Sequence, residues 1–276
     1  MKKYVRIEIE TASAEESEIL IAELSEIDFY SFEEKENTLI AYIEETDYDE
    51  DGLKEILAGK RKFAKAIIEE ENWNRQWESG IQPVIVNQFA AVRPSFHPPV
   101  VGVKHDLIIT PKMSFGTGHH ATTFLMIELM ETINFQNKTV LDFGTGTGVL
   151  AILAEKCGAS KITAMDCDEW SIRNTLENVE ANHCKNILVE KKSDPSGIEP
   201  VDVILANINL NVLVNAASVI TSLLKPGSLF LTSGFLDRNE NEMQNIFGEK
   251  DVVKKQIRQS GEWMAILFQK SQGRIL

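Results

Sequence analysis

The feature that most constrains the fold is a glycine-rich turn that joins an apolar strand to an apolar helix. Residues 139–149 read Thr-Val-Leu-Asp-Phe-Gly-Thr-Gly-Thr-Gly-Val. Glycine accepts positive φ angles and lets a ligand approach the main chain closely. A strand, a glycine turn and a helix together present backbone N–H groups at the helix N-terminus, a common place for nucleotides to bind. We therefore expect an α/β fold with a nucleotide-like ligand at this turn.

The spacing of the glycines narrows the class of ligand. The turn has the pattern G-x-G-x-G, and Asp142 stands two residues before Gly144. Dinucleotide-binding folds carry G-x-G-x-x-G instead, so a nicotinamide oxidoreductase is disfavoured. The D-x-G-x-G-x-G turn resembles the first motif of Rossmann-like methyltransferases that use S-adenosylmethionine (AdoMet).

Predicted strands and helices alternate after this turn. Apolar runs predict strands at 162–165, 187–189, 201–206 and 228–232, and longer amphipathic segments predict helices at 169–181, 210–224 and 237–247. Such alternation is typical of a parallel sheet with helices on both faces. Pro226-Gly227 predicts a turn before the strand at 228–232. The last two strands, at 252–259 and 263–268, are joined by a short turn, which predicts an antiparallel edge on a Rossmann-like methyltransferase sheet.

Two polar side chains stand at the ends of these predicted strands. Asp166 follows Gly144 by 22 residues, where an acidic side chain can accept both hydroxyls of an adenosine ribose. It could instead cap the next helix, although Asp168 is better placed for that. Asn207 ends the fourth strand, beside the point where the strand order reverses and ligands bind. Amine methyltransferases that this chain resembles place an Asn or Asp there, which implies that its amide orients the attacking amine; alternatively, Asn207 caps the helix that begins at Leu210.

The first part of the chain differs in charge. The formal net charge is −14, and residues 1–56 alone hold 5 Lys and Arg against 18 Asp and Glu, a net charge of −13. Their order of strand, helix, strand, strand, helix, strand predicts a small ferredoxin-like α+β domain. We place this acidic substrate-recognition domain at 1–70, a linker at 71–80 and the methyltransferase domain at 81–276. The acidity could be a solvated face or could attract a basic partner; nucleic acid is disfavoured.

Composition also bears on location. Charge interrupts the apolar run at the N-terminus, so it does not read as a signal peptide. No uncharged run approaches the roughly 20 residues of a membrane span. The three cysteines form no C-x-x-C pair, which predicts a reduced, cytoplasmic protein without a metal site.

Over nearly the whole chain, these motifs resemble one family, the methyltransferases of bacterial ribosomal protein L11 (PrmA type). The resemblance rests on Glu71 to Trp77 in the linker, Phe-Gly-Thr-Gly-His-His-Ala-Thr-Thr at 115–123, the glycine turn, Asp166 and Ala206-Asn207-Ile208. It implies AdoMet contacts at Thr123, Gly144, Asp166 and Asn207. It also implies that the loop 115–118 covers the methionine end of the cofactor.

The resemblance further implies direct displacement at the sulfonium methyl by a neutral amine, either a lysine ε-amine or the N-terminal α-amine. Such a reaction depends mainly on proximity and alignment. Asn207 is the expected catalytic residue, and no dedicated base is identified. The sequence departs from the family pattern at His119 and Ala121, whereas His120 matches it. We assign neither histidine a catalytic role.

The expected substrate is a basic ribosomal large-subunit protein, steered by the acidic residues 1–56. Trp73 and Trp77 could staple the linker to a neighbouring domain, and the linker would then act as a hinge; alternatively, one of them walls the active site. A methyltransferase of another protein, a small molecule or nucleic acid would share the cofactor site without needing the acidic domain. A non-catalytic relative would be expected to lack the Phe-Gly-Thr-Gly loop or Asn207.

Overall fold

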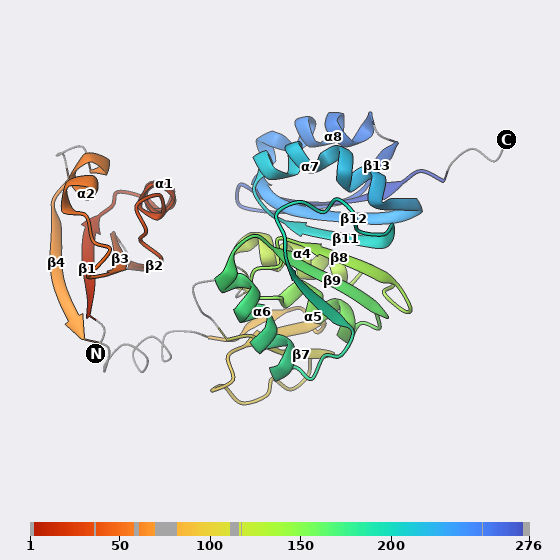
Figure 1. The fold of residues 1–276 in the computed structure, drawn as a ribbon, viewed down its shortest axis with the longest axis horizontal. Helices are drawn as coiled ribbons and strands as arrows, with labels where there is room; N and C mark the ends of the chain where they lie inside the picture. Colours follow the sequence, from red (N-terminus) through yellow and green to blue (C-terminus); the bar gives the residue numbers. More distant parts are fainter. Residues whose placement is uncertain are drawn as a thin grey trace. The chain divides into compact units, whose positions relative to one another are not determined.

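The chain divides into two compact units, Met1–Ile81 and Gln82–Leu276 (Figure 1). The computed structural model describes residues 3–35, 37–57, 61–69, 82–110, 116, 118–249 and 251–272. The linker at 71–80, with Trp73 and Trp77, lies outside these residues. The division into domains at 1–70 and 81–276 therefore stays a prediction.

Within its described residues, the first unit is a four-stranded antiparallel sheet with two helices. Its elements are β1 (Lys3–Glu10), α1 (Ala14–Ser25), β2 (Ser31–Lys35), β3 (Thr38–Glu44), α2 (Glu50–Ile56) and β4 (Phe63–Glu69). The strands lie in the order β2-β3-β1-β4. Side chains alternate along β1, so that Val5, Ile7 and Ile9 share a buried core with Leu20 and Leu24 of α1. The ferredoxin-like classification of this unit stays a prediction.

The second unit contains a three-stranded and a seven-stranded sheet. The first comprises β5 (Val84–Val86), β6 (Ala90–Arg93) and β7 (His105–Ile108). The second comprises β8 (Thr139–Phe143), β9 (Lys161–Asp166), β10 (Ile187–Lys191), β11 (Val201–Asn207), β12 (Leu224–Leu236), β13 (Val252–Ser260) and β14 (Trp263–Lys270). The helices are α4 (Ala121–Met130), α5 (Val149–Lys156), α6 (Glu169–Ala181), α7 (Leu210–Leu223) and α8 (Glu240–Gly248), with a short 3-10 turn, η2 (Asp237–Asn239), before α8.

The large sheet has the strand order β10-β9-β8-β11-β12-β14-β13. The five strands from β10 to β12 are parallel, and β14 runs antiparallel to both β12 and β13. The predicted Rossmann-like sheet with an antiparallel edge is therefore confirmed. The order reverses between β8 and β11, and in such sheets ligands bind outside the carboxyl ends of the strands at this point.

Helices cover both faces of this sheet, with α4, α5 and α6 on one face and α7 and α8 on the other (Figure 1). Successive strand residues supply the two cores, since side chains alternate between the faces. On β8, Val140 packs with α4 and α5, whereas Leu141 packs with α7 and α8. On β11, Val203 likewise packs with α4 and α5, and Ile204 packs with α7 and α8. No helix in the described ranges combines the length and the apolar character needed to cross a membrane.

The predicted turn at Pro226-Gly227 is wrong as a boundary, because β12 already begins at Leu224. β12 pairs with β11 at Leu224 and again at Leu229, opposite Val201 and Val203. The residues between these two pairs form a bulge, in which Gly227 has a φ of +81°. Pro226-Gly227 does bend the chain locally, but it does not end the strand, because β12 pairs with β11 both before and after these two residues.

Candidate functional site

The glycine turn has the backbone that its sequence predicts. Gly144, Gly146 and Gly148 have φ angles of +76°, +56° and +83°. The N–H groups of Gly144 and Thr145 both donate to the carbonyl of Met165 at 2.9 Å, which fixes the turn to the end of β9. A Cβ atom on Gly144 would lie 2.1 Å from Cγ2 of Ile208. A side chain at this position would therefore meet both backbone strain and a steric clash.

Asp142 holds the turn from beneath. Its carboxylate is fully buried, and Oδ2 accepts hydrogen bonds from Oγ1 of Thr145 at 2.7 Å and from the N–H of Ala151 at 3.2 Å. Oδ1 has no partner among the described residues. Burial raises the pKa of the Asp142 carboxyl to about 7, against the opposing effect of the two hydrogen bonds. One carboxylate thus joins β8, the turn and the first residues of α5.

Asp166 lies at the end of β9, beside the turn. Its Oδ2 accepts from the N–H of Gly146 at 3.0 Å, and its Oδ1 accepts from the N–H of Asp168 at 3.0 Å. Asp168, not Asp166, caps α6 by accepting from the N–H of Ser171 at 2.9 Å. The helix-cap alternative for Asp166 is therefore wrong. Both of its oxygens keep further capacity to accept hydrogen bonds, as a ribose contact requires.

Asn207 lies at the end of β11, next to β8. Its side-chain amide Nδ2 donates to Oγ1 of Thr123 on α4 at 3.2 Å, and its Oδ1 is buried without a partner among the described residues. The residue is only 9% exposed, and Thr123 is fully buried. Asn209 caps α7 by accepting from the N–H of Val212 at 3.0 Å, so the helix-cap alternative for Asn207 is also wrong.

The loop before α4 is tied to the glycine turn. Oγ1 of Thr147 donates to the carbonyl of Gly116 at 2.7 Å. Gly116 and Gly118 have φ angles of +110° and +92°, so both need the freedom of glycine. The residues 111–115 and 117 of this loop lie outside the described part of the chain.

The two loop histidines have separate structural contacts. His120 caps α4, and its Nδ1 accepts from the N–H of Thr122 at 3.2 Å. Its ring meets Trp263 edge to face at a centroid distance of 4.7 Å, and burial lowers its pKa. His119 is exposed, and its Nε2 lies 2.9 Å from the carbonyl of Gln82.

Sequence reasoning missed Gly234, which makes room for the residue after Asn207. A Cβ on Gly234 would lie 2.1 Å from the carbonyl oxygen of Ile208. The register of β12 and β14 shifts between Ser233 and Phe235, and Gly234 has a φ of +98°. A lone glycine inside a strand often marks a bulge or a close backbone approach, but the predicted strand ended at Thr232, and only the structure extends β12 to Leu236 and places Gly234 within it.

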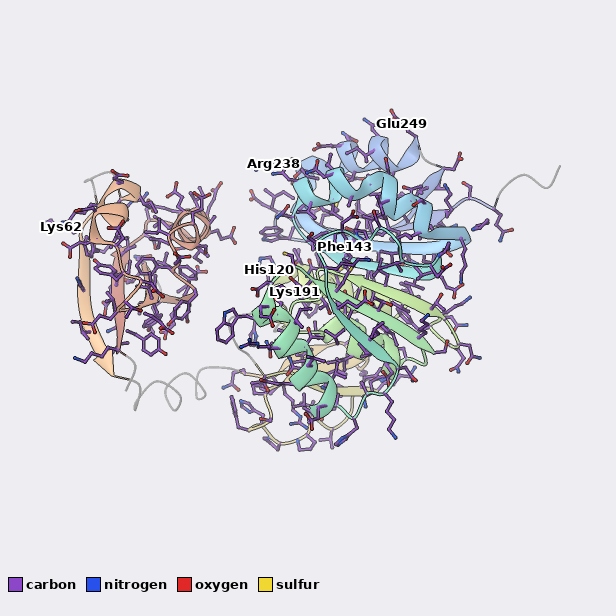
Figure 2. The ribbon with its side chains drawn as sticks, in the orientation of Figure 1. Lys62, His120, Phe143, Lys191, Arg238 and Glu249 are labelled. Carbon is purple, nitrogen blue, oxygen red and sulfur yellow. The ribbon has the colours of Figure 1, made fainter. Side chains whose placement is uncertain are left out.

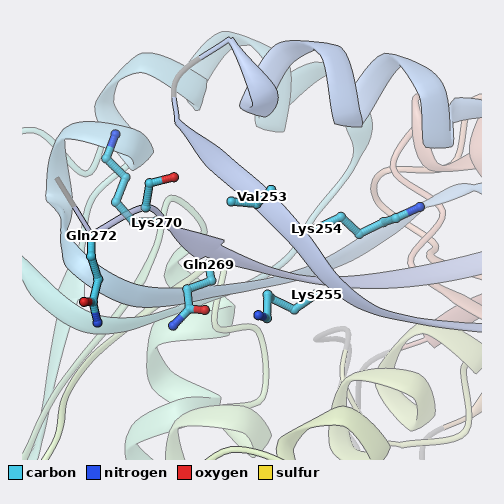
Figure 3. Close-up of a pocket in the computed structure, with 7 residues that line it drawn as sticks. Val253, Lys254, Lys255, Gln269, Lys270 and Gln272 are labelled. Atoms are coloured by element: carbon cyan, nitrogen blue, oxygen red, sulfur yellow. The ribbon is translucent and has the colours of Figure 1, made fainter. Parts of the chain in front are cut away.

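The strand order brings the predicted residues to one edge of the sheet. Gly144, Asp166 and Asn207 follow or end β8, β9 and β11, and the hydrogen bond from Asn207 adds Thr123 of α4. Figure 2 marks this edge by Phe143, the last residue of β8, and Lys191, the last residue of β10. A hollow of about 310 Å³ lies elsewhere, on the β13–β14 pair (Figure 3). It is lined by Val253, Lys254, Lys255, Gln269, Lys270, Ser271 and Gln272.

This site fits AdoMet. The glycine turn leaves the main chain open to a ligand, the Asp166 carboxylate can accept ribose hydroxyls, and a buried amide oxygen lies at the neighbouring strand end. Together with the strand order, these features define the class of the protein as a Rossmann-like, AdoMet-dependent methyltransferase.

Comparison with known proteins gives the family. Residues 3–271 match the family described as Ribosomal protein L11 methyltransferase (PrmA), and the chain belongs to this family. A ribosomal protein L11 methyltransferase of Porphyromonas gingivalis is 40% identical over 264 residues, covering 91% of this chain and 90% of that protein. One of Bacteroides fragilis is 38% identical over 245 residues, covering 84% and 87%. The crystal structure of a ribosomal protein L11 methylase from Lactobacillus delbrueckii subsp. bulgaricus superposes with a TM-score of 0.65 at 25% identity, covering 69% of this chain and 100% of that one.

Proposed function

We propose that this protein transfers methyl groups from AdoMet to lysine ε-amino groups and the N-terminal α-amino group of ribosomal protein L11. The names of its relatives support the substrate. The observation that carries the chemistry is the buried Oδ1 of Asn207, which has no partner among the residues that the structure describes. An acceptor that is removed from water without a partner costs free energy, and it is satisfied when a donor such as an amine N–H arrives.

The proposed cofactor contacts are Thr123, Gly144, Asp166 and Asn207. When bound, AdoMet supplies an electrophilic methyl group on a positively charged sulfur, so the leaving group needs no acid. The carboxylate of Asp166 would accept the ribose hydroxyls, and the open backbone at Gly144 would let the cofactor lie against the main chain. These roles are supported by the position of each residue at the carboxyl edge of the sheet.

Thr123 decides which atom of the Asn207 amide meets the nucleophile. Because Nδ2 donates to Oγ1 of Thr123, Oδ1 is the atom left to accept a hydrogen bond. An amine that donates one N–H to Oδ1 has its lone pair held in a fixed direction, which is the alignment that displacement needs. Removal from water disfavours the ammonium form, so the amine can lose its proton to solvent before transfer.

The acidic first unit is proposed to recognise the substrate. Its helix α1 has exposed Glu15, Glu18 and Glu23, and opposite charges on a basic protein would be attracted to such a surface. Phosphate would be repelled, so no nucleic-acid contact is proposed for this unit. We also propose that the protein acts in the cytoplasm, which the unpaired Cys157, Cys167 and Cys184 support.

The test is incubation of the full-length protein with methyl-labelled AdoMet and purified large-subunit ribosomal proteins, followed by peptide mass spectrometry. We expect label on lysines and on the N-terminus of ribosomal protein L11. Label confined to RNA, to a small molecule or to other proteins would overturn the proposal. A variant without residues 1–70 should bind AdoMet with wild-type affinity in calorimetry but leave ribosomal protein L11 unmethylated. If this variant methylated ribosomal protein L11 as well as the full-length protein does, the acidic unit would not be needed for substrate recognition.

A further inference from the structure

A row of polar side chains lies on the buried face of α6 and on the residue that follows it. Its members are Asn174, Thr175, Asn178 and Asn182, and all of them are almost fully buried. Asn and Thr have no advantage in a helix interior, where they lose rotamer freedom or compete for backbone groups. Their presence on a buried face therefore calls for polar partners, because an unpaired polar group in a core is costly.

Two members of this row bind successive carbonyls of the glycine turn. Oγ1 of Thr175 donates to the carbonyl of Gly146 at 2.9 Å, and Nδ2 of Asn178 donates to the carbonyl of Thr147 at 2.8 Å. A trans peptide places its N–H opposite its C=O. These bonds therefore direct the N–H groups of the same two peptides, those of Thr147 and Gly148, away from α6. The N–H of Gly148 closes the turn on the carbonyl of Thr145 at 2.8 Å.

Asn178 also binds the segment that leads to the Phe-Gly-Thr-Gly loop. Its Oδ1 accepts from the N–H of Thr110 at 2.9 Å. On the far side of residues 111–115, the carbonyl of Gly116 accepts from Oγ1 of Thr147. Thr147 is thus bound to Asn178 through its carbonyl and to Gly116 through its side chain. One amide on α6 joins the glycine turn to the segment before the loop.

The glycine turn needs such support. Glycine loses more backbone freedom on folding than any other residue, and three glycines with positive φ leave the turn with many alternative conformations. We propose that Thr175 and Asn178 are positioning residues for AdoMet, which fix the carbonyls of Gly146 and Thr147 so that the turn is preformed for the cofactor. This inference rests on the proposed cofactor site at the turn. Neither side chain is assigned a contact with AdoMet or with the amine.

Asn182 provides a matched control for Asn178. It is also a buried asparagine, one helical turn further on, but it binds the strand β7 instead of the turn. Its Oδ1 accepts from the N–H of Ile108 at 2.9 Å, and its Nδ2 donates to the carbonyl of Ile108 at 2.6 Å. Replacing either asparagine with Asp keeps the acceptor and the size of the side chain but sets an oxygen against a carbonyl.

The experiment measures AdoMet binding to the full-length protein by calorimetry. We expect Asn178→Asp to weaken binding about tenfold or more, and Asn182→Asp to change it less than about twofold. In steady-state assays, Asn178→Asp should raise KM for AdoMet with kcat at saturation little changed. Equal weakening by both variants, or wild-type affinity in Asn178→Asp, would overturn the inference. If the wild-type protein bound no AdoMet, the proposed cofactor site would fail instead.

Thr175 gives a second route if Asn178→Asp does not fold. Thr175→Val keeps the shape and removes the hydroxyl, whereas Thr175→Ser keeps the hydroxyl. We expect Thr175→Val to weaken AdoMet binding about threefold to tenfold and Thr175→Ser to restore most of the affinity. Wild-type affinity in Thr175→Val, measured on protein whose circular dichroism shows it to be folded, would contradict the role of the α6 row.

Discussion

The two central strands of the large sheet, β8 and β11, end side by side but present different chemistry. After β8, the main chain faces the site: three glycines form the turn, and Asp142, Thr175 and Asn178 bind it from behind. At the end of β11, a side chain faces the site: Thr123 binds one amide atom of Asn207, and no described residue binds the other.

Under the proposed function, this difference separates the binding of AdoMet from catalysis. A preformed backbone surface suits a cofactor whose position need not change between binding and reaction. A single buried acceptor suits a nucleophile whose direction decides the rate. We therefore expect substitutions around the β8 end to change AdoMet affinity or stability, and substitutions around the β11 end to change kcat.

Asn207→Ala tests the β11 end most directly. We expect kcat to fall about 100-fold, because the amine would lose the acceptor proposed to direct its lone pair. The dissociation constant of AdoMet should rise by less, since Asn207 is one of four proposed cofactor contacts. Steady-state kinetics with ribosomal protein L11 and calorimetry with AdoMet measure the two quantities. Thr232→Val is the control, because Thr232 on β12 also has a buried oxygen without a partner in the described chain. If the affinity for AdoMet fell as much as kcat, Asn207 would not act mainly in catalysis, and the proposed division between the β8 and β11 ends would be wrong.

Asp166→Ala tests the β8 side. We expect AdoMet to bind about 30-fold more weakly, because hydrogen bonds to a charged group are lost, while kcat at saturating AdoMet changes little. Asp168→Ala is the control, since it removes the cap of α6 and should cost about 1 kcal/mol of stability with little effect on affinity. Wild-type affinity of Asp166→Ala in calorimetry would show that the ribose carboxylate is assigned to the wrong residue.

Thr123→Val asks whether Thr123 serves the cofactor or the amide. If it orients Asn207, kcat should fall about tenfold, because the released amide can turn its NH₂ group toward the amine. Thr122→Val is matched to it, since Thr122 is buried on the same turn of α4 but contacts His120. Unchanged kcat with weaker AdoMet binding would indicate that Thr123 contacts the cofactor and does not orient Asn207.

Asp142→Asn should have the smallest effect, on stability. Burial raises the carboxyl pKa from 3.8 to about 7, so the native state holds a proton that the unfolded chain has already lost. The native state therefore loses stability as the pH rises through this range. The variant has no carboxyl at this position, so its stability should not fall in this way. We expect the free energy of unfolding of the variant, minus that of wild type, to be larger at pH 8 than at pH 5 by about 1 kcal/mol or more. Urea unfolding at both pH values measures this, and parallel pH dependences would contradict it.

The sequence was most informative where local pattern and chemistry agree. The helix predicted at 169–181 is α6, because its apolar and polar residues follow helical spacing and Asp168 stands at its start. The glycine turn, Asp166 and Asn207 were recognisable because each follows a predicted apolar strand. Their shared edge then followed from the alternation of strands and helices.

The parts that escaped prediction depend on which strands become neighbours. Gly234 matters because β12 lies beside β11, and Asn178 matters because α6 packs against a turn 31 residues earlier in the chain. No local pattern encodes either contact. Pro226-Gly227 shows the opposite error, since a genuine local turn signal was overridden by pairing with β11.

The position of Ile208 between two glycines limits how this protein can evolve. A side chain at Gly144 would collide with the side chain of Ile208, whereas one at Gly234 would collide with its main chain. A smaller residue at 208 would relieve the first collision but not the second. Replacement of Gly144 therefore needs both an earlier change at 208 and a residue that tolerates a φ of +76°, which makes the two contacting sites epistatic. Position 234 has no such permissive partner, because every residue at 208 brings the same carbonyl.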